Sequence, residues 1–371
     1  MKTKAALLRA SPGKWEVAEV DLDPPKASEV LVRLEATGLC HSDDHLVSGD
    51  IPLSKSPFVG GHEGVGVVED VGPGVGTLQV GDRIVTSFVP ACGHCRWCTS
   101  GAQNLCDTGA RLLAGSQSDG TYRMHLDGQD VGQMCSISTF SEYSIMPVAS
   151  CVRIDTDVPA SSACLLGCGV PTGWSSATLA AEVTGGDVVL VIGAGGVGMN
   201  AVQGARHVGA AHVLAVDPIA FKRDTALQFG ATEVFAGVGD AADRARSLTN
   251  GQGADSAIVT VGVLAGDHIA QAFSAIRKGG IVVVTSAAPA MATGIPVSLL
   301  ELTMYQKRIQ GAIFGTGSPG REIPRLLELY RTGALKLDEL VTQTYSIEQI
   351  NDAFADMHSG RNVRGVITFE S

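Results

Sequence analysis

The chain has 371 residues, of which 45% are hydrophobic, and its formal net charge is −11. This length allows two domains with a large core, and the apolar content predicts a globular protein rather than a disordered one. The negative charge argues against nucleic acid and against an anionic membrane surface as binding partners.

The N-terminal residues 1–9 carry only four apolar side chains between charged ones. Such a segment is too short for a signal peptide or a membrane span, so we expect a cytoplasmic protein with no membrane partner. In a reducing compartment, the nine cysteines of the chain favour metal ligation over disulfides.

Short β-like runs broken by glycine and proline dominate the first part of the chain, and residues 30–34 and 64–71 are examples. Residues 185–315 differ, because apolar runs there alternate with helical stretches. This alternation is typical of buried parallel strands joined by crossover helices, which make a doubly wound domain. The strands expected there are 188–192, 213–216, 257–260 and 281–284.

The C-terminal part of the chain predicts one more helix and one more strand. Ser346 and Gln349 have the spacing of a capping box, which starts a helix expected to run to about Met357. Residues 366–369 are β-branched and aromatic and are expected to form a final strand. We expect this tail to return to the first domain.

One cysteine, one histidine and a distant second cysteine form the first metal pattern: Cys40, His62 and Cys168. Three such ligands leave a fourth position open, which is how a catalytic zinc ion is held. Zinc bound this way acts as a Lewis acid on a bound alcohol. Asp43 is placed to accept the second N–H of His62 and orient the ring. Glu63 adjoins the metal and is expected to tune it, unless it is an ordinary solvated turn carboxylate.

Two further residues beside the first ligand predict a proton relay. Ser42 follows Cys40 directly, and its hydroxyl is placed to take the substrate proton. A hydroxyl is a poor base alone, so we expect His45 to pass the proton to solvent. The competing interpretation of His45 is a plain surface histidine.

A second metal pattern has four cysteines with the spacing C-x2-C-x2-C-x7-C. Four thiolates complete a tetrahedron and leave no vacancy, so this site predicts a second, structural zinc ion. An iron–sulfur cluster is the alternative, although nothing else in the chain implies electron transfer. The four ligands are Cys92, Cys95, Cys98 and Cys106.

A glycine-rich hexapeptide, residues 193–198, follows the first strand of the doubly wound domain. Its strand–turn–helix context predicts a dinucleotide pyrophosphate site at the helix N-terminus, although incidental glycines are the alternative. Asp217, at the end of the second strand, is placed to bind both ribose hydroxyls and to repel a 2′-phosphate, so NAD(H) is expected over NADP(H). Lys222 is a further candidate for ribose binding. The loop contacts are Gly193, Gly195, Gly196, Val197 and Gly198.

With these motifs the chain resembles the zinc-containing medium-chain alcohol dehydrogenases over its whole length. The similar stretches are Gly61-His62-Glu63 with Gly66 and Gly72, and residues 167–173. The resemblance implies an α/β protein with a GroES-like β-rich catalytic domain (1–169 and 314–371) and a doubly wound Rossmann NAD-binding domain (170–313). It also implies a substrate channel lined by Phe88 and Met134, Thr172 beside the nicotinamide, and Arg364 at the pyrophosphate.

The chain is similar, more closely, to the NDMA-dependent branch of that family, in residues 39–43, 90–98, 130–135, 170–174 and 204–207. In that branch NAD(H) stays bound and is reoxidised in place by an external acceptor, thought to be mycofactocin, or by the dye NDMA. His41 stands where related enzymes often carry Arg, and His is a weaker phosphate ligand at neutral pH. Other contacts are therefore expected to retain NAD(H), and the loop between Asp107 and Met134 is a candidate. The length of that loop also favours a homodimer over a tetramer.

The expected activity is the interconversion of a primary, apolar or aromatic alcohol and its aldehyde by hydride transfer to NAD. The alternative enzymatic activity is that of a mycothiol-type formaldehyde dehydrogenase, which acts on a hydroxymethyl thioether. Such an enzyme would use the same residues. A conventional enzyme that exchanges NAD with solvent is another alternative. A non-catalytic member of the superfamily is disfavoured because all zinc ligands are present.

Overall fold

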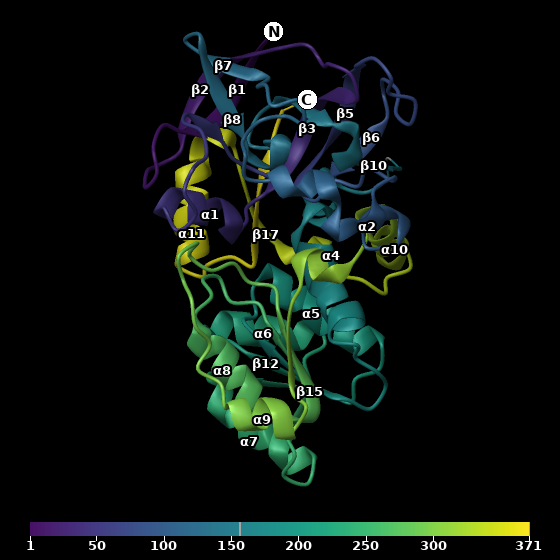
Figure 1. Cartoon of the computed structure of the whole chain (residues 1–371), viewed down its shortest axis with the longest axis vertical. Coiled ribbons are helices and arrows are strands. Elements are labelled where there is room, and N and C mark those ends of the chain that lie inside the picture. Colours follow the sequence, from purple (N-terminus) through teal and green to yellow (C-terminus); the bar gives the residue numbers. More distant parts are fainter. Residues whose placement is uncertain (156, 371) are drawn as a thin grey trace. The chain divides into compact units, whose positions relative to one another are not determined.

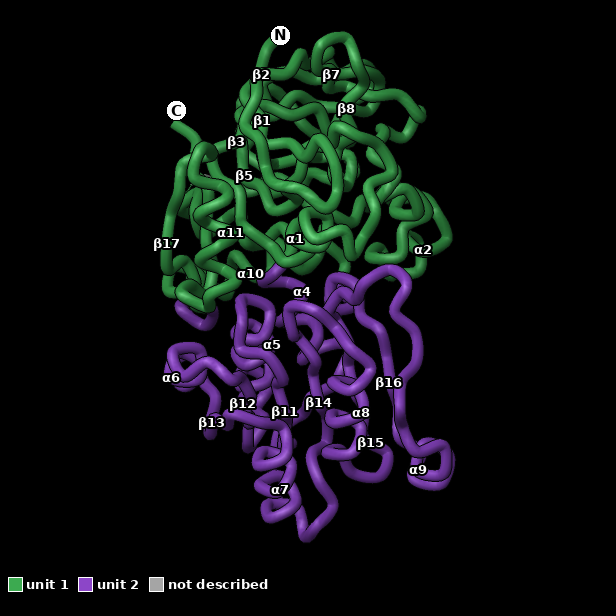
Figure 2. Tube along the Cα trace, turned by 90° about the vertical axis from the view of Figure 1, so that its left-hand side faces the viewer, with its two compact units in different colours: residues 1–168, 318–332, 336–371 green, residues 169–317, 333–335 purple. Residues whose placement is uncertain are grey.

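The computed structural model describes residues 1–155 and 157–370. The chain splits into two compact units, coloured separately in Figure 2. Unit 1 comprises Met1–Cys168, Ser318–Thr332 and Lys336–Ser371, and unit 2 comprises Gly169–Gly317 and Gly333–Leu335. The chain therefore leaves unit 1 after Cys168 and re-enters it at Ser318, beside the two boundaries predicted at 169/170 and 313/314.

Unit 1 is β-rich and contains a closed barrel and a second sheet (Figure 1). The barrel order is β1 (Lys2–Leu8), β2 (Glu16–Leu22), β7 (Met124–Leu126), β8 (Gln129–Gln133) and β4 (Phe58–Val59). The second sheet has the order β10 (Cys151–Ile154), β6 (Arg83–Thr86), β5 (Gly64–Val71), β3 (Glu29–Gly38), β18 (Arg364–Thr368) and β17 (Val341–Tyr345), and β9 (Tyr143–Pro147) also pairs with β3.

The C-terminal tail completes unit 1, as predicted. Ser346 and Gln349 form the capping box, and a 3-10 turn there leads into α11 (Ile350–His358). The last strand, β18, lies antiparallel to β3, with Val366 opposite Gly38. Trp15 packs edge-on against Phe140 and stacks on Phe354 of α11, so the tail is held by core contacts as well as by the sheet.

The segment between Asp107 and Met134 is not the long loop that we expected. It supplies β7 and β8 to the barrel, joined by Asp127 and Gly128, which both have positive φ (52° and 77°). An Asp-Gly pair is a strong hairpin signal because both central residues of such a tight turn need a left-handed backbone. Arg123, fully buried, pairs with Glu29 at 2.6 Å and anchors the segment to β3.

Unit 2 has the doubly wound architecture that the apolar runs predicted. Its six parallel strands have the order β13 (Glu233–Phe235), β12 (His212–Val216), β11 (Val188–Ile192), β14 (Ala254–Val259), β15 (Ile276–Val284) and β16 (Arg308–Gly311). All five residues of β11 are buried, as expected of a strand covered on both faces. Its main helices are α4 (Gly169–Ser175), α5 (Gly196–His207), α6 (Ala220–Gln228), α7 (Val238–Leu248), α8 (Gly266–Ala275) and α9 (Leu299–Met304).

The remaining α-helices belong to unit 1: α1 (His41–Ser48), α2 (Arg96–Thr99), α3 (Ala160–Ala163) and α10 (Pro319–Arg331). In the part of the chain that the structure describes, no helix has the length and apolar character needed to cross a membrane.

Candidate active site

Four side chains of unit 1 converge on one point: Cys40, His62, Glu63 and Cys168, whose potential ligand atoms all lie within 4.8 Å of one another. Cys40 precedes α1, His62 and Glu63 precede β5, and Cys168 ends the turn that follows α3. Gly61 makes this approach possible, because its φ is +85° and a Cβ there would collide with the backbone of Phe140. The structure thus brings together the three predicted ligands of the first metal pattern.

The charges of this cluster suit a bound dication. The hydrogen bond from Cys168 and the positive charges of His62 and Arg364 lower the pKa of Cys40 well below the usual value of a thiol. Burial alone would lower the pKa of His62, but the carboxylate of Asp43 and the Cys40 thiolate outweigh it and raise that pKa. Two sulfurs and one imidazole in this arrangement fit zinc, which is borderline soft.

Asp43 lies beside the ring of His62, which we expect it to orient. Its Oδ2 lies 3.3 Å from Nδ1 of His62, in ion-pair range although not aligned as a hydrogen bond. Its Oδ1 accepts a 2.8 Å hydrogen bond from the backbone N–H of Gly61, and the carboxylate is fully buried. Since Nδ1 faces Asp43, the other ring nitrogen is left for the metal cluster.

Glu63 is not a solvated turn carboxylate, because its side chain is fully buried. Burial raises its pKa to about 7 against the opposing charge of Arg364, with Cys40 adding to the rise. Nη2 of Arg364 donates to Glu63 and, at 3.0 Å, to the carbonyl of Leu39. The sequence did not predict this pairing, since it depends on β18 lying beside β3.

The two proton-relay candidates both lie on α1. The Ser42 hydroxyl lies 3.6 Å from the Cys40 sulfur. His45 is only 2% exposed, so the alternative of a plain surface histidine is wrong. Its Nδ1 lies 2.9 Å from Asp50, a partner that the sequence did not suggest, and its buried Nε2 has no hydrogen-bond partner among the described residues.

The predicted substrate-channel residues lie in unit 1. The rings of Phe88 and His62 pack edge to face, with centroids 5.7 Å apart and an interplanar angle of 82°. Met134 is buried in the core of the unit. Cys135 follows in a left-handed conformation (φ 52°), and its N–H donates to the carbonyl of Leu112 at 3.1 Å. His41, the first residue of α1, is half-buried.

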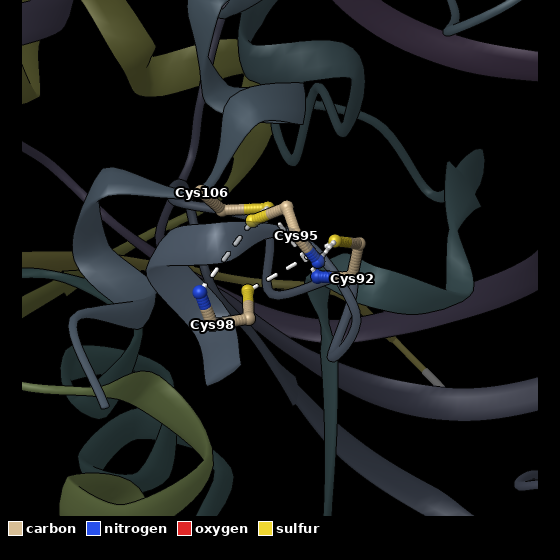
Figure 3. Close-up of side chains that lie close together, drawn as sticks. All are labelled: Cys92, Cys95, Cys98 and Cys106. Atoms are coloured by element: carbon tan, nitrogen blue, oxygen red, sulfur yellow. Dashed lines mark hydrogen bonds between the residues drawn. The ribbon is translucent and has the colours of Figure 1, made fainter. Parts of the chain in front are cut away.

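The second cysteine pattern also forms a compact cluster, with the four sulfurs within 4.8 Å of one another (Figure 3). Backbone N–H groups point at these sulfurs, with Cys95 donating to Cys92 at 3.4 Å and Cys98 donating to Cys95 at 3.5 Å. Hydrogen bonds from the backbone of Asp107 and Cys98 lower the pKa of Cys95 to about 6. Burial alone would raise the pKa of Cys106, but hydrogen bonds from Thr108 and Cys92 outweigh it and lower that pKa. Four clustered thiols, two of which ionise more readily than usual, fit a closed structural zinc site.

In unit 2, the glycine-rich loop lies between β11 and α5, as predicted. Gly193 has a φ of +98° and a Cβ there would lie 2.8 Å from the carbonyl of Thr260, while a Cβ on Gly198 would collide with the carbonyl of Gly193. A Cβ on Gly195, by contrast, would meet no atom within 4 Å. The loop therefore needs glycine at two positions for its own packing, and at the third it keeps open space where a phosphate can approach. Gly196 and Val197 open α5.

Asp217 follows β12 and is 6% exposed. Its two carboxylate oxygens accept 2.9 Å hydrogen bonds from the backbone of Ala194 and Ile219, which fixes the group beside the loop. Lys222 is half-buried on α6. Its neighbour Arg223 donates to the carbonyl of Asp217 at 2.8 Å, a contact that only the turn geometry reveals. Thr172 of α4 has a buried hydroxyl with no hydrogen-bond partner among the described residues.

Two family models match the chain: the alcohol dehydrogenase GroES-like domain over residues 26–156 and the zinc-binding dehydrogenase over residues 196–332. An NDMA-dependent alcohol dehydrogenase of Amycolatopsis methanolica is 49% identical over 367 residues, which cover 99% of each chain. The chain belongs to the zinc-containing medium-chain alcohol dehydrogenases. Alcohol dehydrogenase B of Mycobacterium tuberculosis is 46% identical, over 100% of this chain and 99% of that protein. The solved benzyl alcohol dehydrogenase of Acinetobacter calcoaceticus matches with a TM-score of 0.91 and 30% identity over all of both chains.

Membership of this family indicates which cofactors the cysteine clusters and the glycine-rich loop bind. The chain is an alcohol dehydrogenase of the zinc medium-chain type, with the GroES-like and Rossmann folds that the sequence predicted. Its cysteine clusters and its glycine-rich loop fit zinc and NAD(H), the cofactors of that type.

Proposed function

We propose that this alcohol dehydrogenase interconverts primary, apolar or aromatic alcohols and their aldehydes, with NAD(H) that stays bound and is reoxidised in place by an external acceptor of the mycofactocin type. The observation that carries the proposal is the 49% identity, over 99% of both chains, to an NDMA-dependent enzyme. All residues of both predicted metal patterns also converge. When bound, zinc polarises the alcohol oxygen and NAD accepts the hydride.

Each side chain of the metal cluster has a proposed task. Cys40, His62 and Cys168 hold the catalytic zinc, and Asp43 fixes the ring of His62. Glu63 lies in the same cluster and is proposed to tune the metal. The four sulfurs of the second cluster hold a structural zinc ion, which gives two zinc ions per chain.

Proton movement is assigned to Ser42 and His45. The Ser42 hydroxyl lies beside the first ligand and takes the proton of the alcohol. A carboxylate at His45 Nδ1 keeps the proton on that nitrogen, so Nε2 is the one that can accept another. The buried, unpartnered state of Nε2 supports this role.

The proposed substrate class rests on two apolar side chains of unit 1, one of which contacts a metal ligand. The rings of Phe88 and His62 meet edge to face, and Met134 is buried in the core against which Phe88 packs. Sites lined by aromatic and aliphatic groups bind apolar ligands better than sugars or acids. Benzyl-type and aliphatic primary alcohols are therefore the proposed substrates.

The cofactor is assigned to unit 2. The loop residues 193–198 receive the pyrophosphate, Asp217 binds the ribose and disfavours NADP(H), and Lys222 lies near enough in sequence to assist. Thr172 is proposed to lie beside the nicotinamide. His41 and Arg364, both in unit 1, are proposed pyrophosphate contacts, although Arg364 already pairs with Glu63.

Retention of the cofactor is tested on desalted protein. After exhaustive gel filtration the protein is denatured, and the released NAD(H) is quantified against the protein concentration. We expect close to one equivalent per chain and alcohol-dependent reduction of NDMA without added NAD. Release of no cofactor, with activity restored by free NAD, would instead identify an enzyme that exchanges its cofactor.

We also propose that the chain forms a homodimer through the β16 edge of unit 2. β16 is the last strand of its sheet, and α9 beside it buries none of its side chains among the described residues. Leu299, Leu300 and Met304 are 75%, 72% and 69% exposed. An edge strand can pair antiparallel with its own two-fold image, so a second copy would cover both the edge and the apolar patch. Light scattering should give the mass of two chains, and Leu300→Lys should lower it to one; a wild-type monomer would refute the proposal.

A further inference from the structure

Helix α1 ends on a glycine that turns the chain back toward His45. Gly49 has a φ of +86°, the left-handed conformation in which many helices end. Beyond it, the N–H of Ile51 donates to the carbonyl of His45 at 3.0 Å, which closes the turn. Asp50 lies between these two residues, and its Oδ2 is 2.9 Å from Nδ1 of His45. The end of the helix therefore builds a carboxylate–imidazole pair from residues five positions apart.

The two side chains of this pair differ in their access to solvent. The side chain of His45 is 2% exposed, whereas that of Asp50 is 30% exposed. The second ring nitrogen, Nε2, is buried and has no hydrogen-bond partner among the described residues. Buried polar atoms in native proteins nearly always have a partner. With the proton of a neutral ring on Nδ1, Nε2 carries the lone pair that can accept a further proton.

Asp50 is the charged group that faces this ring. The other carboxylates of α1 face elsewhere, because Asp43 lies beside the metal cluster and Asp44 pairs with His358 of α11 at 2.8 Å. The N-terminal segment contributes the hydroxyl of Ser11, which carries no charge, to a carbonyl of α1. Among the described residues, Asp50 is thus the one charged group in ion-pair range of the ring. The ring also lies in the last turn of α1, where the helix dipole favours a positive charge.

We propose that Asp50 is a positioning residue of the proton relay: it holds the proton of the neutral His45 ring on Nδ1, and it stabilises the imidazolium that forms when Nε2 receives the proton of the alcohol. The inference rests on the proposed function, because it takes His45 as the residue that follows Ser42 in the relay. Asp50 stays ionised throughout, as the orienting carboxylate of a catalytic triad does. A neutral partner would favour the imidazolium less, so the relay would work with a weaker base.

The first test follows the rate of alcohol oxidation by the holoenzyme against pH. Asp50→Asn is compared with Asp44→Asn, which removes the same charge six residues earlier in the chain. The ring must be neutral to accept a proton, so we expect the pH of half-maximal rate to fall by roughly one unit in Asp50→Asn. Its maximal rate should fall about three- to tenfold. Asp44→Asn should keep the half-maximal pH within about 0.2 unit, because its ion pair with His358 is exposed to solvent.

The second test reads the protonated nitrogen directly and does not depend on activity. In zinc-loaded protein with 15N-labelled histidine, NMR shows which ring nitrogen carries the proton, and the signals of His45 are those missing from His45→Gln. We expect the proton of the neutral ring on Nδ1 in the wild-type protein near pH 8. Asp50→Ala should give a mixture of the two tautomers, since the acceptor that selects one of them is lost. A residue that only supported the fold would leave the tautomer unchanged.

The variant His45→Gln separates this inference from the relay itself. A wild-type pH profile in His45→Gln would refute the relay, and the role of Asp50 would fall with it. If His45→Gln changes the profile but Asp50→Asn does not, or if Asp44→Asn shifts it as far, His45 acts without Asp50 and the inference is overturned. Asp50→Glu serves if Asp50→Asn does not fold. It keeps the charge, so it should keep the wild-type half-maximal pH; a shift toward lower pH there would overturn the inference as well.

Discussion

Cys168→Ser should lower the rate of alcohol oxidation by roughly a thousandfold or more while the protein stays folded and still binds NAD(H). The sulfur of Cys168 belongs to the cluster with Cys40 and His62, and serine is a poor zinc ligand at neutral pH. Without the metal, polarisation of the alcohol is lost, which is worth several kcal/mol of the barrier. Metal analysis should find one zinc ion per chain, against the two proposed for the wild-type protein.

Cys164→Ser is the matched control, because the same atom changes four residues earlier in the chain. Cys164 is also buried, but its sulfur donates to the carbonyl of Ser161 at 3.2 Å and lies outside the metal cluster. A serine hydroxyl can keep that hydrogen bond, so activity and both zinc ions should remain.

The reciprocal variant Cys106→Ser should lose the other zinc ion and lower the melting temperature. Full activity in Cys168→Ser would show that Cys168 is not a ligand of the catalytic zinc.

The sequence predicted those features that depend on local spacing or on a repeating pattern. The four-cysteine run and the glycine-rich loop are each contained in a few residues, so the spacing alone predicts their shape. The four central strands of unit 2 were predicted because burial on both faces demands continuous apolar runs, as in residues 188–192. The edge strands β13 and β16 were not predicted. The capping box at Ser346 was predicted for the same reason, since its two partners are three residues apart.

Features that depend on contacts between distant segments could not be predicted from spacing. Arg364 and Glu63 are 301 residues apart and meet because β18 pairs with β3. Asp50 reaches His45 only because the chain turns back after α1. The hairpin at Asp127 is different, because an Asp-Gly pair flanked by strand residues was a usable signal that we read as part of a loop.

Loss of the buried guanidinium in Arg364→Met should destabilise unit 1 by about 3–5 kcal/mol, because the Glu63 carboxylate is then left buried without its opposite charge. The double variant Arg364→Met with Glu63→Gln should recover much of this loss, since neither charge then remains. Urea unfolding of wild type, both single variants and the double variant, all saturated with zinc, gives the coupling energy. Additive effects of the two substitutions would show that the pair does not stabilise the fold.

The loss of folding stability in Arg364→Met should also depend on pH. The direction of this dependence follows from the raised pKa of Glu63. Burial already raises the pKa of Glu63 to about 7 in the presence of Arg364, and removal of the positive charge raises it further. A carboxyl group whose pKa is higher in the folded state than in the unfolded state binds more protons when folded, so its contribution to stability falls as pH rises between the two values. The deficit of Arg364→Met relative to wild type should therefore be small near pH 5 and largest above pH 7. A deficit that is constant over this range would mean that the variant loses packing rather than a charge partner, because the methylenes of an arginine contribute to stability at every pH.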